Sequence, residues 1–161
     1  MDDQRSDEPI IPIRKVLFLC TRNSCRSQMA EAIVNTLIGD RWQAFSAGVN
    51  PGDSIHPMAL AVLQEMKIDH QGRSKPVDEF NLDAFDLVVS ICEPAVEECP
   101  NWFGSGKHLH HNFPDPAKSG RMEDFRKVRD AICYEVIPLM LQHEDAPCKD
   151  NAPFRLKEIK N

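Results

Sequence analysis

The chain lacks three features that would point to particular classes of function. It has no basic excess, because 19 Lys and Arg stand against 25 Asp and Glu, giving a net charge of −6. Nonspecific nucleic-acid binding depends on a basic surface, so this balance argues against it. No apolar run approaches the roughly 20 residues that span a bilayer, and we expect no membrane insertion. We also find no internal repeat and no second domain.

A secretory apolar stretch is missing as well, which bears on the six cysteines of this 161-residue chain. Disulfide frameworks belong mainly to secreted proteins, whereas cytosolic thiols stay reduced. We therefore expect a cytoplasmic protein whose thiols are available for chemistry. The length suits one domain with a substantial core. We expect this domain at 14–143, between a polar arm at 1–13 and a tail without helical periodicity at 144–161.

Short apolar runs alternate with amphipathic helical segments along the chain. The first run, 16–19, is followed by helical spacing of apolar residues over 24–37. Continuous apolar strands that alternate with helices are typical of a parallel sheet covered on both faces. The sequence therefore predicts an α/β fold. Further strands are expected at 42–46, 85–91 and 107–112, and further helices at 57–66, with Ser54 as its N-cap, and at 122–142, kinked by Pro138.

The first strand runs into Cys20, which is followed by five residues and then by Arg26 and Ser27. This spacing lets the backbone curl so that successive N–H groups face one tetrahedral anion while the arginine holds two of its oxygens. A helix that begins at Ser24 would direct its positive end to the same place and favour a Cys20 thiolate. The alternative is a buried cysteine beside a surface arginine. The expected oxyanion loop comprises Thr21, Arg22, Asn23, Ser24, Cys25, Arg26 and Ser27.

Two further groups follow later strands and so reach the same edge of a parallel sheet, where such folds bind ligands. Cys92 and Cys99 flank an acidic, partly helical loop directly after the strand at 85–91. They are either thiols that converge on Cys20 or small apolar core residues. Asp115 lies between two prolines after the last expected strand, and it fits either a general acid or an ordinary turn.

Three histidines close to the last expected strand resemble a metal-binding tract. They are His108, His110 and His111. Only two of them share a strand face, and no other ligand is indicated. We therefore expect them to be rim or surface residues and expect no metal site.

Together these segments resemble the low molecular weight phosphotyrosine phosphatase superfamily, and more closely its thioredoxin-coupled arsenate reductases. The likeness runs from about residue 15 to about residue 142. It rests on the sequences at 20–27, 29–31, 45–48, 115–117 and 125–130 and on the Cys92 and Cys99 pair. The pair favours a reductase, because a phosphatase has no use for resolving thiols there. The resemblance implies a single four-stranded parallel sheet with helices on both faces.

The resemblance also implies roles for individual residues. Cys20 would be the nucleophile, Arg26 would bind the oxyanion, and Asp115 would be the acid. Cys92 and Cys99 would complete a thiol relay that thioredoxin regenerates. The implied substrate is arsenate, with phosphate or sulfate as mimics, and no cofactor is implied. We expect a monomer.

Two supporting roles are expected close to the nucleophile. Ser27 is expected to donate its hydroxyl to the Cys20 thiolate, and Asn23 to brace the loop through side-chain hydrogen bonds. Both residues are also common at the start of helices.

The chain departs from its relatives at two positions. Many relatives have Gly where this chain has Arg22, and a positive φ there would strain the arginine. In some arsenate reductases four side chains bind potassium, and three of them match Asn23, Glu31 and Ser46. The fourth is an aspartate where this chain has Lys75. We expect the Lys75 ammonium to pair with Glu31 and to stand in for the cation.

Three other functions fit parts of the pattern. A low molecular weight phosphatase or other phosphomonoesterase would use the same Cys20, Arg26 and Asp115. A thiol-based metal or arsenite binder is a non-enzymatic alternative, although only Cys20 and Cys25 approach the usual spacing of zinc ligands. In a phosphoryl-carrier domain on a similar sheet, Arg26 and Asp115 would be unexpected.

Overall fold

The computed structural model describes residues 12–80, 84–92 and 106–144. Within them, four strands form one parallel sheet in the order β2-β1-β3-β4. This arrangement confirms the predicted α/β fold and its four-stranded parallel sheet. The strands are β1 (Arg14–Cys20), β2 (Trp42–Gly48), β3 (Leu87–Ser90) and β4 (Lys107–His110).

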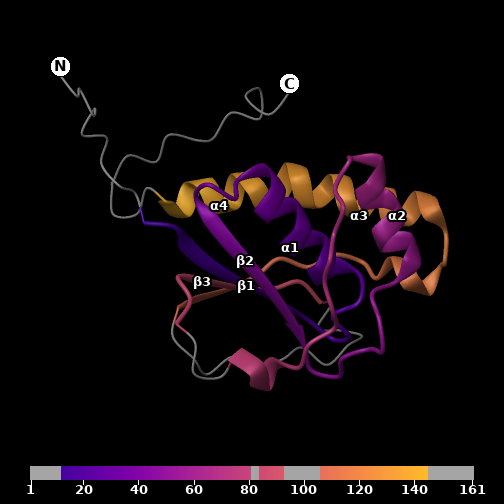
Figure 1. The fold of residues 1–161 in the computed structure, drawn as a ribbon, viewed down its shortest axis with the longest axis horizontal. Helices are drawn as coiled ribbons and strands as arrows, with labels where there is room; N and C mark the ends of the chain where they lie inside the picture. Colours follow the sequence, from indigo (N-terminus) through magenta and orange to yellow (C-terminus); the bar gives the residue numbers. More distant parts are fainter. Residues whose placement is uncertain (1–11, 81–83, 93–105, 145–161) are drawn as a thin grey trace, which may run out of the picture.

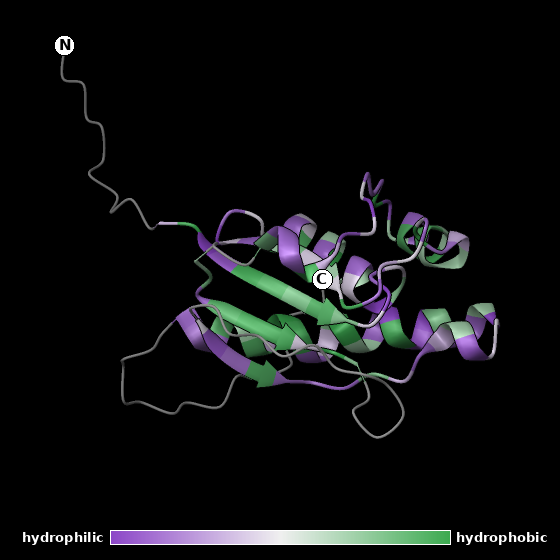
Figure 2. Cartoon of the chain, turned by 90° about the horizontal axis from the view of Figure 1, so that it is seen from below, coloured by the Kyte–Doolittle hydropathy of each residue, from purple (hydrophilic) through white to green (hydrophobic). Residues whose placement is uncertain are grey.

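All four strands point the same way, so the segments that follow them meet at one edge of the sheet (Figure 2). The central strand β1 pairs with β2 and β3, which places Leu19 opposite Ala47 on one side and Ser90 on the other. Cys20, at the end of β1, is opposite Gly48. The predicted meeting of Cys20 with the segments after β3 and β4 at this edge is therefore confirmed.

Helices cover the two faces of the sheet unequally. The four α-helices pack on the face that carries Val16 and Phe18, where they enclose the larger core. The smaller core, on the face of Leu17 and Leu19, includes Phe80 of the 3₁₀ helix η1 (Val77–Phe80). Figure 1 shows the α-helices gathered on one side and η1 on the other. The α-helices are α1 (Arg26–Leu37), α2 (Pro57–Glu65), α3 (Met122–Ala131) and α4 (Ile137–Glu144).

The central strands are more hydrophobic than the outer strand β4 (Figure 2). Every residue of β3 is buried, whereas β4 is only partly covered. On β4 the His108 and His110 rings stack with centroids 4.8 Å apart, and His108 Nε2 lies 2.7 Å from Ser90 Oγ. No group of three or more His, Cys, Asp or Glu placed to hold a metal ion occurs in the part of the chain that the structure describes.

The helix starts differ from the prediction at two positions. Helix α1 begins at Arg26 instead of Ser24, because Cys25, with φ −127° and ψ −84°, lies outside the right-handed helical region and is the N-cap residue. The N-cap of α2 is His56 instead of Ser54, and His56 Nδ1 accepts a hydrogen bond of 3.1 Å from the Met58 N–H.

The predicted strand ends also differ from the observed ones. β2 continues two residues further than predicted, to Gly48, while β3 and β4 are both shorter than predicted. The changes in β2 and β4 and at the carboxyl end of β3 fall at the functional edge of the sheet, whereas β3 also begins two residues later, at the opposite edge.

The predicted long helix at 122–142 is interrupted before Pro138. A π-helical stretch, Ile132–Val136, separates α3 from α4. Proline has no N–H, and its ring would crowd the carbonyl four residues earlier, so a widened turn accommodates it. The helical path then continues to Glu144, which the sequence had assigned to the tail. Its carbonyl accepts a 2.7 Å hydrogen bond from Arg14 Nη2, which joins α4 to the start of β1.

Several expectations concern residues outside the described ranges. These are the arm up to residue 11, Cys99 with the loop at 93–105, and the tail from 145 onward. Among the described helices, none is both long and apolar enough to cross a membrane.

Candidate active site

The segment 20–25 turns back on itself so that its carbonyl groups point outward. Four of them accept hydrogen bonds from backbone N–H groups of the segment 49–56, which follows β2. Because each peptide unit is planar and trans, the N–H that follows an outward carbonyl points inward. The resulting concave row of N–H groups is suited to binding an anion. The donor-to-acceptor pairs are Val49 to Cys20 (3.3 Å), Asn50 to Thr21 (2.8 Å), Gly52 to Arg22 (2.9 Å) and His56 to Ser24 (2.9 Å).

The start of helix α1 continues this row of donors. Cys25 is its N-cap residue and makes no side-chain capping bond, so the first N–H groups of the helix remain available. A helix N-terminus also carries a partial positive charge. Both features favour an anion held between the loop and the helix.

Two donors are aimed at the Cys20 sulfur. The Asn23 N–H lies 3.0 Å from Cys20 Sγ, and Ser27 Oγ lies 2.7 Å from it. Asn23 Nδ2 donates to Ser27 Oγ at 2.8 Å, which leaves the Ser27 hydroxyl hydrogen to point at the sulfur. Hydrogen bonds to a charged atom stabilise that charged form. The geometry therefore suits a thiolate, and it agrees with the contacts expected for Ser27 and Asn23.

The left-handed residue of the loop is Asn23, and Arg22 does not share that conformation. Arg22 is therefore accommodated without the strain that a positive φ would impose on it. Asparagine tolerates a positive φ better than most residues. Its Oδ1 accepts hydrogen bonds from the Lys75 N–H at 2.8 Å and from Gln28 Nε2 at 2.9 Å, which fixes the amide in place.

Gly48 is required where the loop lies against the end of β2. A Cβ at this position would lie 2.7 Å from the Thr21 oxygen and 2.9 Å from the Asn23 nitrogen. Both are backbone atoms, so any side chain here would displace the loop.

A cavity of about 90 Å³ is enclosed by this loop and by the segment after β4. Cys20, Arg26 and Asp115 all line it, so the structure brings the three expected catalytic side chains together. Arg26 is buried, and its Nη1 donates to the Phe113 carbonyl at 3.1 Å. Asp115 accepts a 3.0 Å hydrogen bond from the Ala117 N–H at the start of a short 3₁₀ turn, Pro116–Lys118. Two separate strand ends thus supply the anion site and the carboxylate.

Cys92 leaves the neighbouring strand β3 at the same edge. It is fully buried and belongs to a disulfide, whereas Cys20, Cys25 and Cys133 are free. Adjacent strands lie about 4.8 Å apart. Since Leu19 is opposite Ser90, Cys20 is level with Ile91, and Cys92 follows one residue later, just beyond the end of β3.

Cys25 also lines the cavity, and its thiol is held in the protonated form. Burial raises the pKa of the Cys25 thiol to about 11, and the Asp115 carboxylate adds to this shift while the Ser24 hydroxyl opposes it. A thiol reacts through its thiolate, so Cys25 is unreactive at neutral pH.

We predict that alkylation of Cys25 by iodoacetamide accelerates about tenfold per pH unit from pH 7 to pH 10, following its thiolate fraction. Peptide mass spectrometry of a Cys20→Ser variant measures this rate without interference from the neighbouring thiol. A plateau below about pH 9 would show that Cys25 ionises far more readily than its buried position allows.

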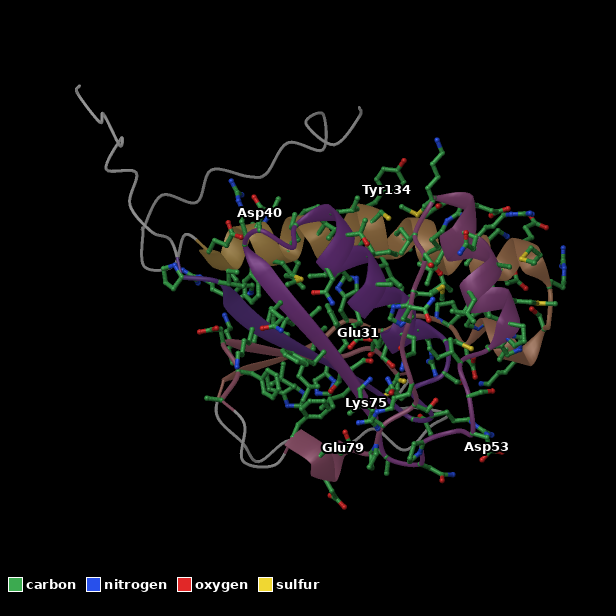
Figure 3. The ribbon with its side chains drawn as sticks, in the orientation of Figure 1. Glu31, Asp40, Asp53, Lys75, Glu79 and Tyr134 are labelled. Carbon is green, nitrogen blue, oxygen red and sulfur yellow. The ribbon has the colours of Figure 1, made fainter. Side chains whose placement is uncertain are left out.

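Glu31 and Lys75 form the ion pair that the sequence predicted. Lys75 Nζ lies 3.9 Å from Glu31 Oε1 and also donates to the Arg73 carbonyl at 2.9 Å. Figure 3 shows the two side chains close together, Glu31 on α1 and Lys75 on the segment before η1. Burial raises the pKa of Glu31, and Lys75 opposes this; burial also lowers the pKa of Lys75, and Glu31 opposes that. The Lys75 ammonium therefore supplies the positive charge beside the Glu31 carboxylate.

The sequence did not predict the side chains that hydrogen-bond to Asn23 and hold it in place. Gln28 is fully buried, and its Nε2 also bonds to the Asn23 carbonyl at 3.1 Å and to the Arg73 carbonyl at 2.8 Å. Its Oε1 lies 2.8 Å from His70 Nε2, which fits a neutral imidazole because burial lowers the pKa of His70. Ser74 Oγ donates to the Asn23 carbonyl at 2.9 Å. The available signal was a glutamine directly after Ser27, near the start of the expected helix.

The geometry can now be compared with known proteins. The family model for low molecular weight phosphotyrosine protein phosphatases matches residues 15–147. This match covers most of the chain and includes every residue of the cavity. The chain belongs to the low molecular weight phosphotyrosine protein phosphatase family.

Relatives within this family include arsenate reductases. Those of Halalkalibacterium halodurans and Bacillus cereus are each 38% identical to this chain, covering 73% and 74% of it and 88% of each relative. A solved arsenate reductase in the phosphate binding state has a TM-score of 0.71 and 35% identity, covering 81% of this chain and 98% of its own. A thioredoxin-dependent arsenate reductase of Corynebacterium glutamicum has a TM-score of 0.62 and 26% identity, covering 81% of this chain and 64% of its own.

Proposed function

We propose that this protein reduces arsenate to arsenite with Cys20 as nucleophile and with electrons from a thiol relay. The observation that carries the proposal is that the buried Cys20 lines an N–H-lined cavity, while Cys92, a cysteine engaged in a disulfide, follows the adjoining strand at the same edge. A phosphatase needs the first of these features only. The similarity to arsenate reductases supports the same conclusion.

The first step is nucleophilic substitution at arsenic. Arsenate binds in the cavity, where the loop N–H groups and Arg26 neutralise its charge. The Cys20 thiolate forms a sulfur–arsenic bond, and an arsenate oxygen departs as water with a proton supplied by Asp115. Arsenic remains pentavalent at this stage, so no electrons have been transferred.

The second step is the reduction. The Cys92 thiolate attacks Cys20 Sγ, the sulfur–arsenic bond breaks, and its electron pair leaves with arsenic as arsenite. A Cys20–Cys92 disulfide remains. Cys99 then attacks Cys92, which releases the Cys20 thiolate and leaves a Cys92–Cys99 disulfide.

The cycle closes when an external dithiol reduces the Cys92–Cys99 disulfide, and we propose thioredoxin for this role. The similarity to a thioredoxin-dependent arsenate reductase supports it. Each turnover then converts arsenate and one dithiol into arsenite, one disulfide and water. A cytoplasmic location, where thioredoxin keeps thiols reduced, is consistent with this chemistry.

Arsenate-dependent oxidation of NADPH, with thioredoxin and its reductase present, tests the proposal. We expect steady turnover that requires all three proteins and yields one arsenite for each NADPH oxidised. Hydrolysis of an aryl phosphate is measured in parallel. Efficient ester hydrolysis without any arsenate-dependent oxidation would favour a phosphatase.

A further inference from the structure

Arg22 is the residue at which this chain departs from the glycine of many relatives, and it lines the anion cavity. It shares this lining with Cys20, Arg26 and Asp115. Unlike Arg26, which is buried, Arg22 is exposed to solvent. It is therefore the solvent-exposed arginine of the cavity lining.

No carboxylate of the described residues neutralises the charge of Arg22. Among residues 12–80, 84–92 and 106–144, no carboxylate lies within ion-pair distance of its guanidinium. The other exposed or half-exposed arginines of these ranges bond to carboxylates or to helix-end carbonyls. Arg22 thus carries a positive charge that no described carboxylate neutralises, beside an anion site in a chain of net charge −6. Such a charge is suited to attracting an anion.

The segment after β2 gives the Arg22 side chain a defined place. The Arg22 carbonyl accepts the Gly52 N–H at 2.9 Å, and a Cβ at Gly52 would lie 3.6 Å from Arg22 Nη2 and 3.7 Å from Nε. The guanidinium thus lies along the bare backbone of Gly52. A larger side chain at residue 52 would compete for this position.

The size of the cavity decides what the guanidinium can reach. At about 90 Å³ the cavity is far smaller than the roughly 300–1,000 Å³ pockets that hold larger ligands, and its size suits one tetrahedral oxyanion. With such an anion beside Cys20 and Arg26, the oxygen opposite the sulfur faces the mouth. In an inorganic oxyanion this atom carries charge, whereas in a phosphate monoester it bears the organic group.

We propose that Arg22 is a specificity-determining residue that favours free inorganic oxyanions over phosphate monoesters. Its guanidinium forms a charge-assisted hydrogen bond to the outward oxygen of the bound anion. An ester group would have to pass this side chain and would gain nothing from it. The preference for inorganic substrate rests on the proposed arsenate reductase function, whereas the contact with the anion does not.

Binding of inorganic phosphate, measured by titration calorimetry, tests the contact without turnover. Arg22→Gln should weaken binding about tenfold at about 0.01 M salt, and less at about 0.3 M, where charges are screened. Arg22→Lys should lose only part of the affinity. Arg41→Gln is the matched control, because it removes the same charge at the amino end of β2, on the opposite edge of the sheet, and it should change binding less than twofold.

Substrate preference is tested with the same variants. Arg22→Gln should lower kcat/KM for arsenate about tenfold, mainly through KM, and should leave kcat/KM for an aryl phosphate within about twofold. Equal losses for both substrates, or a loss no greater than that of Arg41→Gln, would overturn the proposal. If arsenate is not reduced at all, the proposed function fails, while the phosphate titration still decides whether Arg22 contacts the anion.

Discussion

Replacing Cys20 with serine is expected to abolish both arsenate reduction and aryl phosphate hydrolysis, each by at least about 10⁴-fold. Both reactions begin with attack by the same sulfur, and a serine hydroxyl at this position has no base within the loop to activate it. The donors aimed at the sulfur, the Asn23 N–H and the Ser27 hydroxyl, stabilise a thiolate and cannot accept a proton from serine. Steady-state rates with each substrate measure the loss.

Cys92→Ser or Cys99→Ser should separate the two reactions. Either change should end thioredoxin-coupled turnover, because the relay that carries electrons is broken, and should spare ester hydrolysis, which needs no electrons. Cys133→Ser is the matched control, since Cys133 is a free, half-buried thiol on the π-helical stretch away from the cavity. Sustained arsenate turnover by Cys99→Ser with thioredoxin as sole reductant would refute the relay.

Lys75→Met is expected to lower the free energy of unfolding by roughly 3–5 kcal/mol, because it leaves Glu31 as a buried carboxylate without its cation. The lower end of this range is the more appropriate, since each side chain of the pair keeps about a tenth of its surface exposed. The Lys75 backbone N–H bond to Asn23 survives the substitution, so the loop keeps that support. Urea denaturation of both proteins at pH 8 measures the difference.

The pH dependence of this loss follows from the pKa of Glu31, which burial already raises. Without Lys75 the opposing effect disappears, and the folded-state pKa of Glu31 rises further above its unfolded value. The carboxylate therefore destabilises the variant at high pH, and the penalty shrinks as the pH falls and Glu31 binds a proton. A loss that does not change between pH 8 and pH 5 would contradict this account.

A double substitution, Glu31→Gln with Lys75→Met, is the control for the pair. It removes both charges, so it should be more stable than Lys75→Met alone. The natural protein should also melt at the same temperature in sodium and potassium buffers of equal ionic strength, because the ammonium supplies the positive charge. A potassium-specific gain in stability would show that the ion pair does not replace the cation.

The sequence alone determined the features that depend on neighbours along the chain. Apolar runs alternating with helical periodicity predicted the strands and the parallel sheet, because strand and helix periods are local properties. Parallel strands end at one edge, so the positions of Cys20, Cys92 and Asp115 after three strands predicted their meeting place. The spacing from Cys20 to Arg26 predicted the anion loop for the same reason, since its backbone closes within a few residues.

Only the tertiary structure decided what holds that loop in shape. Its carbonyls bond to residues 49–56, and Asn23 is held by Gln28, Ser74 and the Lys75 backbone, up to 52 positions away. The close contact at Gly48 and the place of Arg22 on Gly52 arise in the same way, from segments that meet only after the sheet has formed. Contacts of this kind depend on how whole elements pack. Local sequence patterns do not predict the distances between residues that are far apart in the chain. The left-handed conformation of Asn23 is held by these distant partners, so it too was beyond what the local sequence could predict.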